Sequence, residues 1–368
     1  MHGFQDGAAI EYGDVSWSGF KGLIDSEINN NTYSKARCKT VFCHKPPHEV
    51  LPRITDRQES AIVEVTEEED FYSVSVSRTI ERSDIDGGER QVEGTFALYQ
   101  HGGSQIWTAL TGYDPDFFKR GFKWVFKRSE PHISNLYADS EELRDILKRV
   151  ERELSVDITV DKTVVYSRDE GQISFQTRPY KQVFTDNKLT NGYVDKLNFT
   201  ATRNGELFFD GFISREGVTK LNAGEPDLFY KYLVGSLVNV VSDKLEVLVD
   251  TSREEGGQIT EIEVEFDEDV LRSPADNREL IDALDDLTKT TMAVFHDNPY
   301  AHLSLVDFVD GSNHDIYVTG SNTVSIVPGY KGSVNSLIRV ADQLSKEFQE
   351  GVMHVREEPN YDLTDFVA

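Results

Sequence analysis

FYSVSVSRTI, residues 71–80, decides the fold class of this 368-residue chain. Apolar residues occupy one set of alternate positions, with Tyr72, Val74, Val76 and Ile80 on that face, and Ser or Thr occupies the positions between. Because successive side chains of a strand point to opposite faces, the stretch predicts a half-buried β-strand. A turn at Asp86–Gly88 and two further strand-like stretches, VEGTFALYQ and SQIWTALTG, extend it into an antiparallel meander.

The rest of the chain alternates between short strands and isolated helices. Asp139 and Glu142 have capping-box spacing at the start of a helix, and Asn204-Gly205 predicts a type I′ turn inside a hairpin at 196–213. Further strands are expected at 156–167, at 171–177, on both sides of a Gly-Gly turn between 244 and 266, and within 302–327. Further helices are expected at 226–242, 277–294 and 334–350. Antiparallel hairpins with segregated helices, and no regular βαβ alternation, predict the α+β class.

The expected domain organisation follows these patterns. Residues 1–137 are expected to form an antiparallel β-rich domain with an irregular N-terminal segment. Residues 138–255 form an α+β domain around a buried helix at 226–242, and residues 256–351 form an acidic α+β unit. Residues 352–368 are expected to be an acidic tail, loose or docked on a partner.

The composition is strongly acidic, with 38 Lys and Arg against 65 Asp and Glu and a formal net charge of −27. Such a surface repels nucleic acid and anionic membranes unless it carries a local exception. Scarce Lys, abundant Asp and only two Cys suggest a halophilic prokaryotic source, with an ordinary acidic protein as the alternative. The N-terminal residues lack the apolar segment of a signal peptide, and the apolar run at 228–241 is short and contains Lys231. We therefore expect a cytoplasmic protein that does not contact membranes.

The negative charge is concentrated in the C-terminal third. Residues 241–368 hold 27 acidic and 9 basic residues, a formal charge of −18, which leaves −9 for residues 1–240. A polyanion is therefore expected to approach the N-terminal part, and other protein subunits are expected to pack on the acidic C-terminal half.

FFKRGFKWVFKR, residues 117–128, is the local exception to the acidic composition, because five of its twelve residues are Lys or Arg and none is acidic. As a strand, it would place Phe122, Trp124 and Phe126 on one face. The basic residues Lys119, Arg120, Lys123, Lys127 and Arg128 would then form a cationic ribbon that contacts phosphates, with Trp124 stacking on a base. The alternatives are an edge strand whose aromatic rings enter the core and whose lysines prevent strand pairing, and a dock for the acidic tail.

CKTVFCHKPPHE, residues 38–49, gathers both cysteines and two histidines. Cys38, Cys43, His44 and His48 are residue types that zinc prefers, but their spacing matches no common zinc motif. A small strand with buried thiols, followed by a Pro-rich turn, is the favoured interpretation, and metal binding is left open.

HDNPYAHLSLVDFVDGSNHDIYV, residues 296–318, invites a metal-hydrolase or nuclease hypothesis. If Asp310-Gly311 is a two-residue turn, Asp307 lies across from His314, and the pair can orient a histidine for proton transfer. His302 has the opposite parity from Asp307, so the two residues point to opposite faces. His296 would have to approach from the preceding element to complete the site.

Three functional hypotheses remain at this stage. The favoured one is a non-enzymatic subunit of a prokaryotic complex, such as a DNA-processing or antiviral assembly, that contacts nucleic acid through residues 119–128. The second is a hydrolase centred on the Asp307–His314 hairpin, with no assigned metal ligands and no identified cofactor. The third is a structural assembly protein. The nucleotide-binding loops and catalytic elbows of common enzyme families are absent from the sequence.

Overall fold

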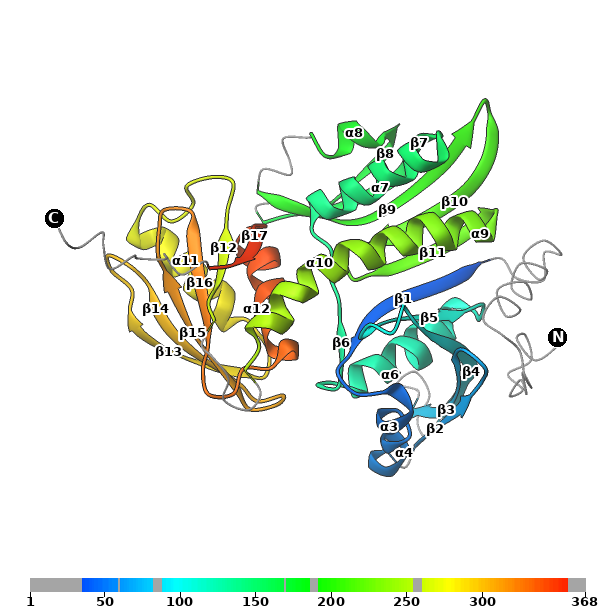
Figure 1. Cartoon of the computed structure of the whole chain (residues 1–368), viewed down its shortest axis with the longest axis horizontal. Coiled ribbons are helices and arrows are strands. Elements are labelled where there is room, and N and C mark those ends of the chain that lie inside the picture. Colours follow the sequence, from blue (N-terminus) through cyan, green and yellow to red (C-terminus); the bar gives the residue numbers. More distant parts are fainter. Residues whose placement is uncertain are drawn as a thin grey trace, which may run out of the picture. The chain divides into compact units, whose positions relative to one another are not determined.

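The computed structural model describes residues 35–58, 60–81, 88–168, 170–185, 191–253 and 260–356. The chain divides into two units, Met1–Ser242 (unit 1) and Asp243–Ala368 (unit 2), shown in Figure 1. Each unit combines helices with an antiparallel sheet, so the predicted α+β class is confirmed. The expected boundary at residue 137 lies inside unit 1.

Unit 1 is built on one long antiparallel sheet that contains eleven of the strands formed by the described residues. A first meander, β2 to β5, and a second, β7 to β11, join at the central strand β1 (Ala36–Cys43), which β5 and β11 flank. The short strand β6 (Ile133–Asn135) also pairs with β1. The sheet order is β2 (Ala61–Glu67), β3 (Tyr72–Glu81), β4 (Glu89–Gln100), β5 (Ile106–Thr111), β1, β11 (Val218–Gly224), β10 (Glu206–Ser214), β9 (Gly192–Arg203), β7 (Asp157–Ser167) and β8 (Gly171–Pro179).

The N-terminal segment, expected to be irregular, contains regular structure in its described part, and the small strand predicted around the cysteines is β1. Strand β1 is followed by two short helices, α3 (Pro47–Val50) and α4 (Arg53–Arg57). All eight positions of β1 are buried, because the strand is covered on both faces. A strand of this kind carries no alternation of apolar and polar residues, which is why its sequence shows no period.

FYSVSVSRTI forms β3 as predicted, with β2 on one side and β4 on the other. Residues 117–128, expected as a strand, are instead helical: α5 (Pro115–Phe117), η1 (Phe118–Phe122), a π-helical segment, and α6 (Lys123–Arg128) follow one another. Asp114 begins the helix, since its Oδ1 accepts the Phe117 amide hydrogen at 2.8 Å and Pro115 follows it.

The aromatic spacing of this segment fits a helix better than a strand. Phe118, Phe122 and Phe126 recur every four residues, and their ring centroids lie 4.9 and 5.2 Å apart in sequence order. The ring of Phe122 also meets Phe96 of β4 at 5.0 Å, so this stripe anchors the helix on the first meander. The strand prediction placed Phe122, Trp124 and Phe126 on one face because they alternate, but in the helix Phe118, Phe122 and Phe126 share a face.

Two glycines allow the helix to approach the sheet closely. A β-carbon added to Gly94 of β4 would lie 2.6 Å from the Phe117 ring, and one added to Gly121 would lie 2.7 Å from it. Both positions therefore leave room for the Phe117 side chain, which is buried.

In the second half of unit 1, helix α7 (Ser140–Leu154) packs on β7 and β9, and α8 (Tyr180–Val183) on β7 and β8. The predicted Asp139–Glu142 capping box is present at the start of α7. Asn204 and Gly205 have φ values of 52° and 84°, as the predicted type I′ turn requires. A long helix follows as α9 (Pro226–Leu228), η3 (Phe229–Val234) and α10 (Gly235–Thr251), and Figure 1 shows α7 beside its first turns. Because α10 continues to Thr251, the prediction of a strand that starts at 244 is wrong.

Unit 2 is a sheet with helices on one face. Its strands, six among the described residues, run in the order β13 (Thr290–His296), β14 (His302–Asp307), β15 (Ser312–Val318), β16 (Thr323–Pro328), β12 (Ile262–Glu265) and β17 (Val352–Val355). The helices are α11 (Pro274–Asp285) and α12 (Val334–Gln343), which continues as η4 (Leu344–Phe348).

Two expectations for unit 2 are corrected. The helix expected at 277–294 ends at Asp285, and Thr290–His296 form the edge strand β13. Lys289 has a φ of 60°, a left-handed conformation that ends helical geometry. The expected tail begins with strand β17, which pairs with β12, and residues 357–368 lie outside the described residues.

Within the described residues, no helix combines the length and apolar character that crossing a membrane requires.

Candidate functional site

The basic residues of 119–128 lie on the outer side of the η1–α6 helix. Lys119, Arg120, Lys127 and Arg128 are exposed, while Lys123 and Trp124 are half-buried. Lys127 and Arg128 end the helix, where cations also complement the helix dipole. Among the described residues, no carboxylate lies within ion-pair distance of Lys119, Lys127 or Arg128. We call the four exposed residues the cationic face.

The protein's own carboxylates engage part of the predicted ribbon. Lys123 Nζ lies 2.8 Å from Glu216 Oε2, and its ammonium also lies 5.9 Å from the Phe118 ring centroid. Arg120 Nε lies 3.2 Å from Asp116 Oδ1. Lys123 is therefore paired within unit 1, and the cationic face consists of the other four basic residues.

Tertiary structure adds an arginine that the sequence did not reveal. Arg78 of β3 stacks on Trp124, with Cζ 4.2 Å from the ring centroid, and its Nη1 donates to the Arg120 carbonyl oxygen at 2.9 Å. Burial lowers the pKa of Arg78, and the positive charges of Arg128 and Arg120 lower it further. The positive charges of Arg120 and Arg128 therefore lie near the Arg78 guanidinium, which stacks on the Trp124 indole.

A second group of basic residues lies near His132, which follows α6 in the chain. Burial lowers the pKa of His132, and the positive charges of Lys45 and Arg53 lower it further, as do those of His44 and Arg57. His132 therefore has the basic residues of the segment 44–57 as its neighbours. Unit 1 carries both groups, although the whole chain is acidic.

The Asp–His hairpin of unit 2 has a different register from the predicted one. Asp307 pairs with Ser312, and His314 pairs with Leu305, because Phe308–Gly311 form a longer turn than the expected two residues. Asp307 and His314 still share one face of the sheet, two positions apart, and both are fully buried against α12.

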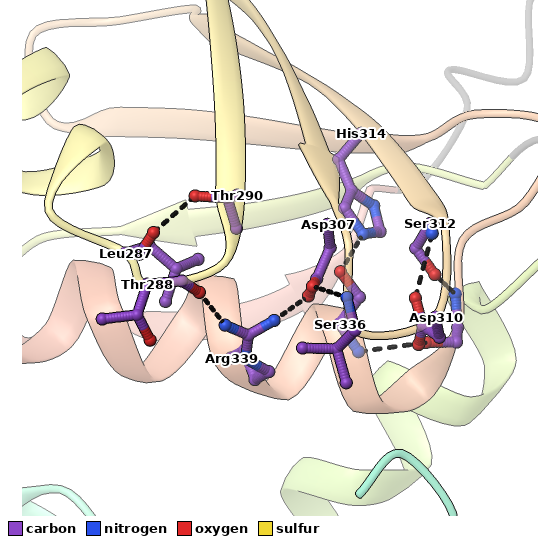
Figure 2. Close-up of polar contacts among 11 residues, drawn as sticks. Leu287, Thr288, Thr290, Asp307, Asp310, Ser312, His314, Ser336 and Arg339 are labelled. Atoms are coloured by element: carbon purple, nitrogen blue, oxygen red, sulfur yellow. Dashed lines mark hydrogen bonds and ion pairs between the residues drawn. The ribbon is translucent and has the colours of Figure 1, made fainter.

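Polar contacts join this hairpin to α12 (Figure 2). Asp307 Oδ2 forms an ion pair with Arg339 Nη1, and its Oδ1 accepts the Val309 amide hydrogen at 2.9 Å. His314 Nε2 lies 2.8 Å from Ser336 Oγ. Burial lowers the pKa of His314 to about 4, despite nearby Asp307 and Asp310.

This network has the geometry of a structural contact that fixes the β14–β15 hairpin to α12. A general base must reach the proton that it abstracts, directly or through one water, and His314 and Ser336 have no exposed surface. Asp310 strengthens this contact between the hairpin and α12, since it accepts hydrogen bonds from the Ser312 amide and the Ser333 hydroxyl. The pKa of Asp310 is lowered: burial opposes the shift, and these hydrogen bonds overcome it.

The two remaining residues of the hydrolase hypothesis lie elsewhere in unit 2. His302 points to the face opposite Asp307, as its parity predicts, and stacks on Tyr317 with ring centroids 4.3 Å apart. His296 pairs with His302 at the end of β13. Both histidines line a pocket of 360 Å³ together with Tyr300, Tyr317, Glu261 and Arg356. The structure therefore brings His296 and His302 together and separates them from Asp307 and His314.

The cysteines lie in β1, as the favoured interpretation expects. Cys38 and Cys43 have opposite parity along the strand, so their thiols point to opposite faces. Burial raises the pKa of Cys38 to about 12 and raises that of Cys43 as well. His48 lies in α3, with its ring 5.3 Å from that of Tyr72. In the part of the chain that the structure describes, no group of three His, Cys, Asp or Glu side chains is placed to hold a metal ion.

No protein-family model matches this chain, and no curated protein sequence is similar to it.

Proposed function

We propose that unit 1 binds nucleic acid through the cationic face and Arg78, and that the chain serves as a non-enzymatic subunit of a prokaryotic complex. The observation that carries the proposal is the exposed cationic face on η1 and α6, beside which Arg78 stacks on Trp124 close to the charges of Arg120 and Arg128. Neighbouring like charges repel each other, and a phosphate group relieves that repulsion because it brings negative charge to the guanidinium groups.

The chemistry of the surface favours a phosphate polymer over a single small anion. The cationic residues follow the helix from Lys119 to Arg128, so several of them can contact successive phosphates of one strand. Arginine also forms two parallel hydrogen bonds to a phosphate and stacks on planar groups. Cations in this arrangement contact the phosphate backbone of the nucleic acid and do not read the base edges. We therefore expect binding with little sequence preference.

The test is a fluorescence-anisotropy titration of labelled single-stranded and duplex DNA with the full chain. Lys127→Glu combined with Arg128→Glu removes two exposed cations that have no carboxylate partner among the described residues. We expect binding to weaken at least about tenfold, and the dependence of log K on log salt concentration to become shallower by about 1 to 2.

A matched pair of substitutions on another helix distinguishes the effect of local contacts from the effect of net charge. Lys148→Glu with Arg152→Glu changes the net charge equally on exposed positions of α7. This control is expected to retain most of the wild-type affinity. Equal losses in both pairs, or no DNA binding by the wild-type chain, would reject the proposed surface.

A further inference from the structure

The edge strand β13 of unit 2 is unusual in its composition. TTMAVFH, residues 290–296, contains no charged residue, although 28% of the chain is charged. Strand β14 pairs with one side of β13, and no described strand pairs with the other. Proteins commonly protect such edges with charged residues or proline, because unpaired backbone groups accept another strand. This edge has neither protection.

Exposed apolar side chains accompany the open edge. Val294 and Phe295 are 46% and 62% exposed, and Tyr300, just beyond the strand, is 62% exposed. Phe308, also exposed, lies at the other end of β13, where its amide donates to the Lys289 carbonyl oxygen at 2.9 Å. These four residues are among only nine large apolar residues that are exposed in the described part of the chain. Their concentration around one strand marks an interaction surface.

A register shift between Val294 and His296 adds shape to this surface. Phe295 is the extra residue, and its ring lies 4.9 Å from that of His302, which in turn stacks on Tyr317. The row of rings borders the 360 Å³ pocket at the end of the strand. Aromatic faces of this kind attract guanidinium groups as well as apolar side chains.

The negative charges around β13 favour a positively charged partner. Asp285 and Asp286 precede the strand and Asp297 follows it, and all three side chains are exposed. Among the described residues, none of the three has a cation within ion-pair distance. Lys289 is the one basic residue between them in the sequence, and unit 2 as a whole carries 27 acidic against 9 basic residues.

We infer that β13 is a docking edge for an extended, arginine-bearing segment of another protein. The segment adds to the sheet as a further strand through backbone hydrogen bonds, and its arginine side chains stack on Phe295 and Tyr300 between the flanking aspartates. The surface lies in unit 2 and does not depend on the nucleic-acid binding proposed for unit 1.

The test uses the full chain and a labelled peptide of about eight residues, an ordinary strand length, that alternates Arg with Val and Thr. We expect saturable binding by anisotropy and slower amide hydrogen exchange in residues 290–296. Phe295→Ala and Tyr300→Ala should each lower the affinity about fivefold. Ala293→Lys, which introduces a charge that protects the edge, should abolish binding.

Controls address both the peptide and the protein. A peptide with Glu in place of Arg should not bind, and Ile62→Ala, an exposed apolar truncation on the edge strand β2 of unit 1, should leave affinity unchanged. Equal binding of the Glu peptide, or an equal loss in Ile62→Ala, would overturn the inference. So would self-association of the wild-type chain in sedimentation that Ala293→Lys eliminates, because β13 would then pair with a second copy.

Discussion

Arg78 and Trp124, forty-six positions apart in the sequence, form a cation–π stack with the guanidinium carbon 4.2 Å from the indole centroid. The contact joins strand β3 to helix α6 and holds a third guanidinium beside Arg120 and Arg128. It therefore links the stability of unit 1 to the shape of the proposed binding surface.

Replacing this ring should weaken unit 1. We expect Trp124→Ala to lower the free energy of unfolding by about 1–2 kcal/mol, because it removes half-buried apolar area and the stack. A cycle with Arg78→Ala should give a coupling energy of about 0.5–1 kcal/mol. Urea unfolding can be followed by the fluorescence of Trp107 in β5, which reports unit 1. Additive effects of the two substitutions would contradict a stabilising stack.

The buried ion pair of unit 2 should be costly to break on one side. Arg339→Met leaves the Asp307 carboxylate, which is fully buried, without its cation, and we expect a loss of about 3–5 kcal/mol. Asp307→Asn combined with Arg339→Met should lower the free energy of unfolding less than Arg339→Met alone, since no buried charge is then left unpaired. Hydrogen exchange of the β14 and β15 amides measures the change within unit 2.

Arg272 supplies the matched control for this experiment. Its pair with Asp269 is exposed, with 68% and 48% of the two side chains accessible, so Arg272→Met should change stability far less than Arg339→Met does. A similar cost for both arginines would mean that the Asp307–Arg339 pair is not the element that fixes the hairpin to α12.

Unit 2 should lose stability in acid through His314. Its pKa of about 4 in the folded chain lies below the ordinary value of 6.5, so the unfolded chain binds more protons between those values. The stabilising contribution is therefore complete above pH 6.5 and is lost as the pH falls toward 4, with a magnitude of roughly 3 kcal/mol. NMR titration of the His314 ring should give a midpoint well below 6, and His314→Gln should flatten the pH dependence of hydrogen exchange in unit 2. A midpoint near 6.5 would refute this.

Two helical glycines should respond to alanine with opposite signs. Gly121→Ala forces a β-carbon against the Phe117 ring and should cost about 1–3 kcal/mol. At Gly235 the nearest atom to an added β-carbon is the Tyr230 carbonyl oxygen at 3.6 Å, an ordinary contact. Gly235→Ala should therefore be neutral or stabilise by up to about 1 kcal/mol, because alanine favours the helix. Tryptophan fluorescence during urea unfolding checks the first, and hydrogen exchange along α10 checks the second.

Local sequence patterns determined many of the elements. The alternation in FYSVSVSRTI, the Asn204-Gly205 turn and the Asp139–Glu142 capping box act between near neighbours in the chain, so their signals survive without knowledge of the fold. They were sufficient for the α+β class and for most strand positions. They failed where burial or spacing was ambiguous: β1 is covered on both faces, and the aromatic residues of 117–128 fit two periods.

Tertiary structure alone decided how the candidate sites are composed. Arg78 reaches the cationic face from another strand, Glu216 removes Lys123 from it, and a longer turn moves Asp307 away from the position opposite His314. The sequence by itself determined that unit 1 holds a cationic exception within an acidic chain, because net charge and local composition need no coordinates. Which charges stay exposed depends on partners distant in the sequence, and only the folded chain brings those partners within the few ångströms over which ion pairs and ring contacts act.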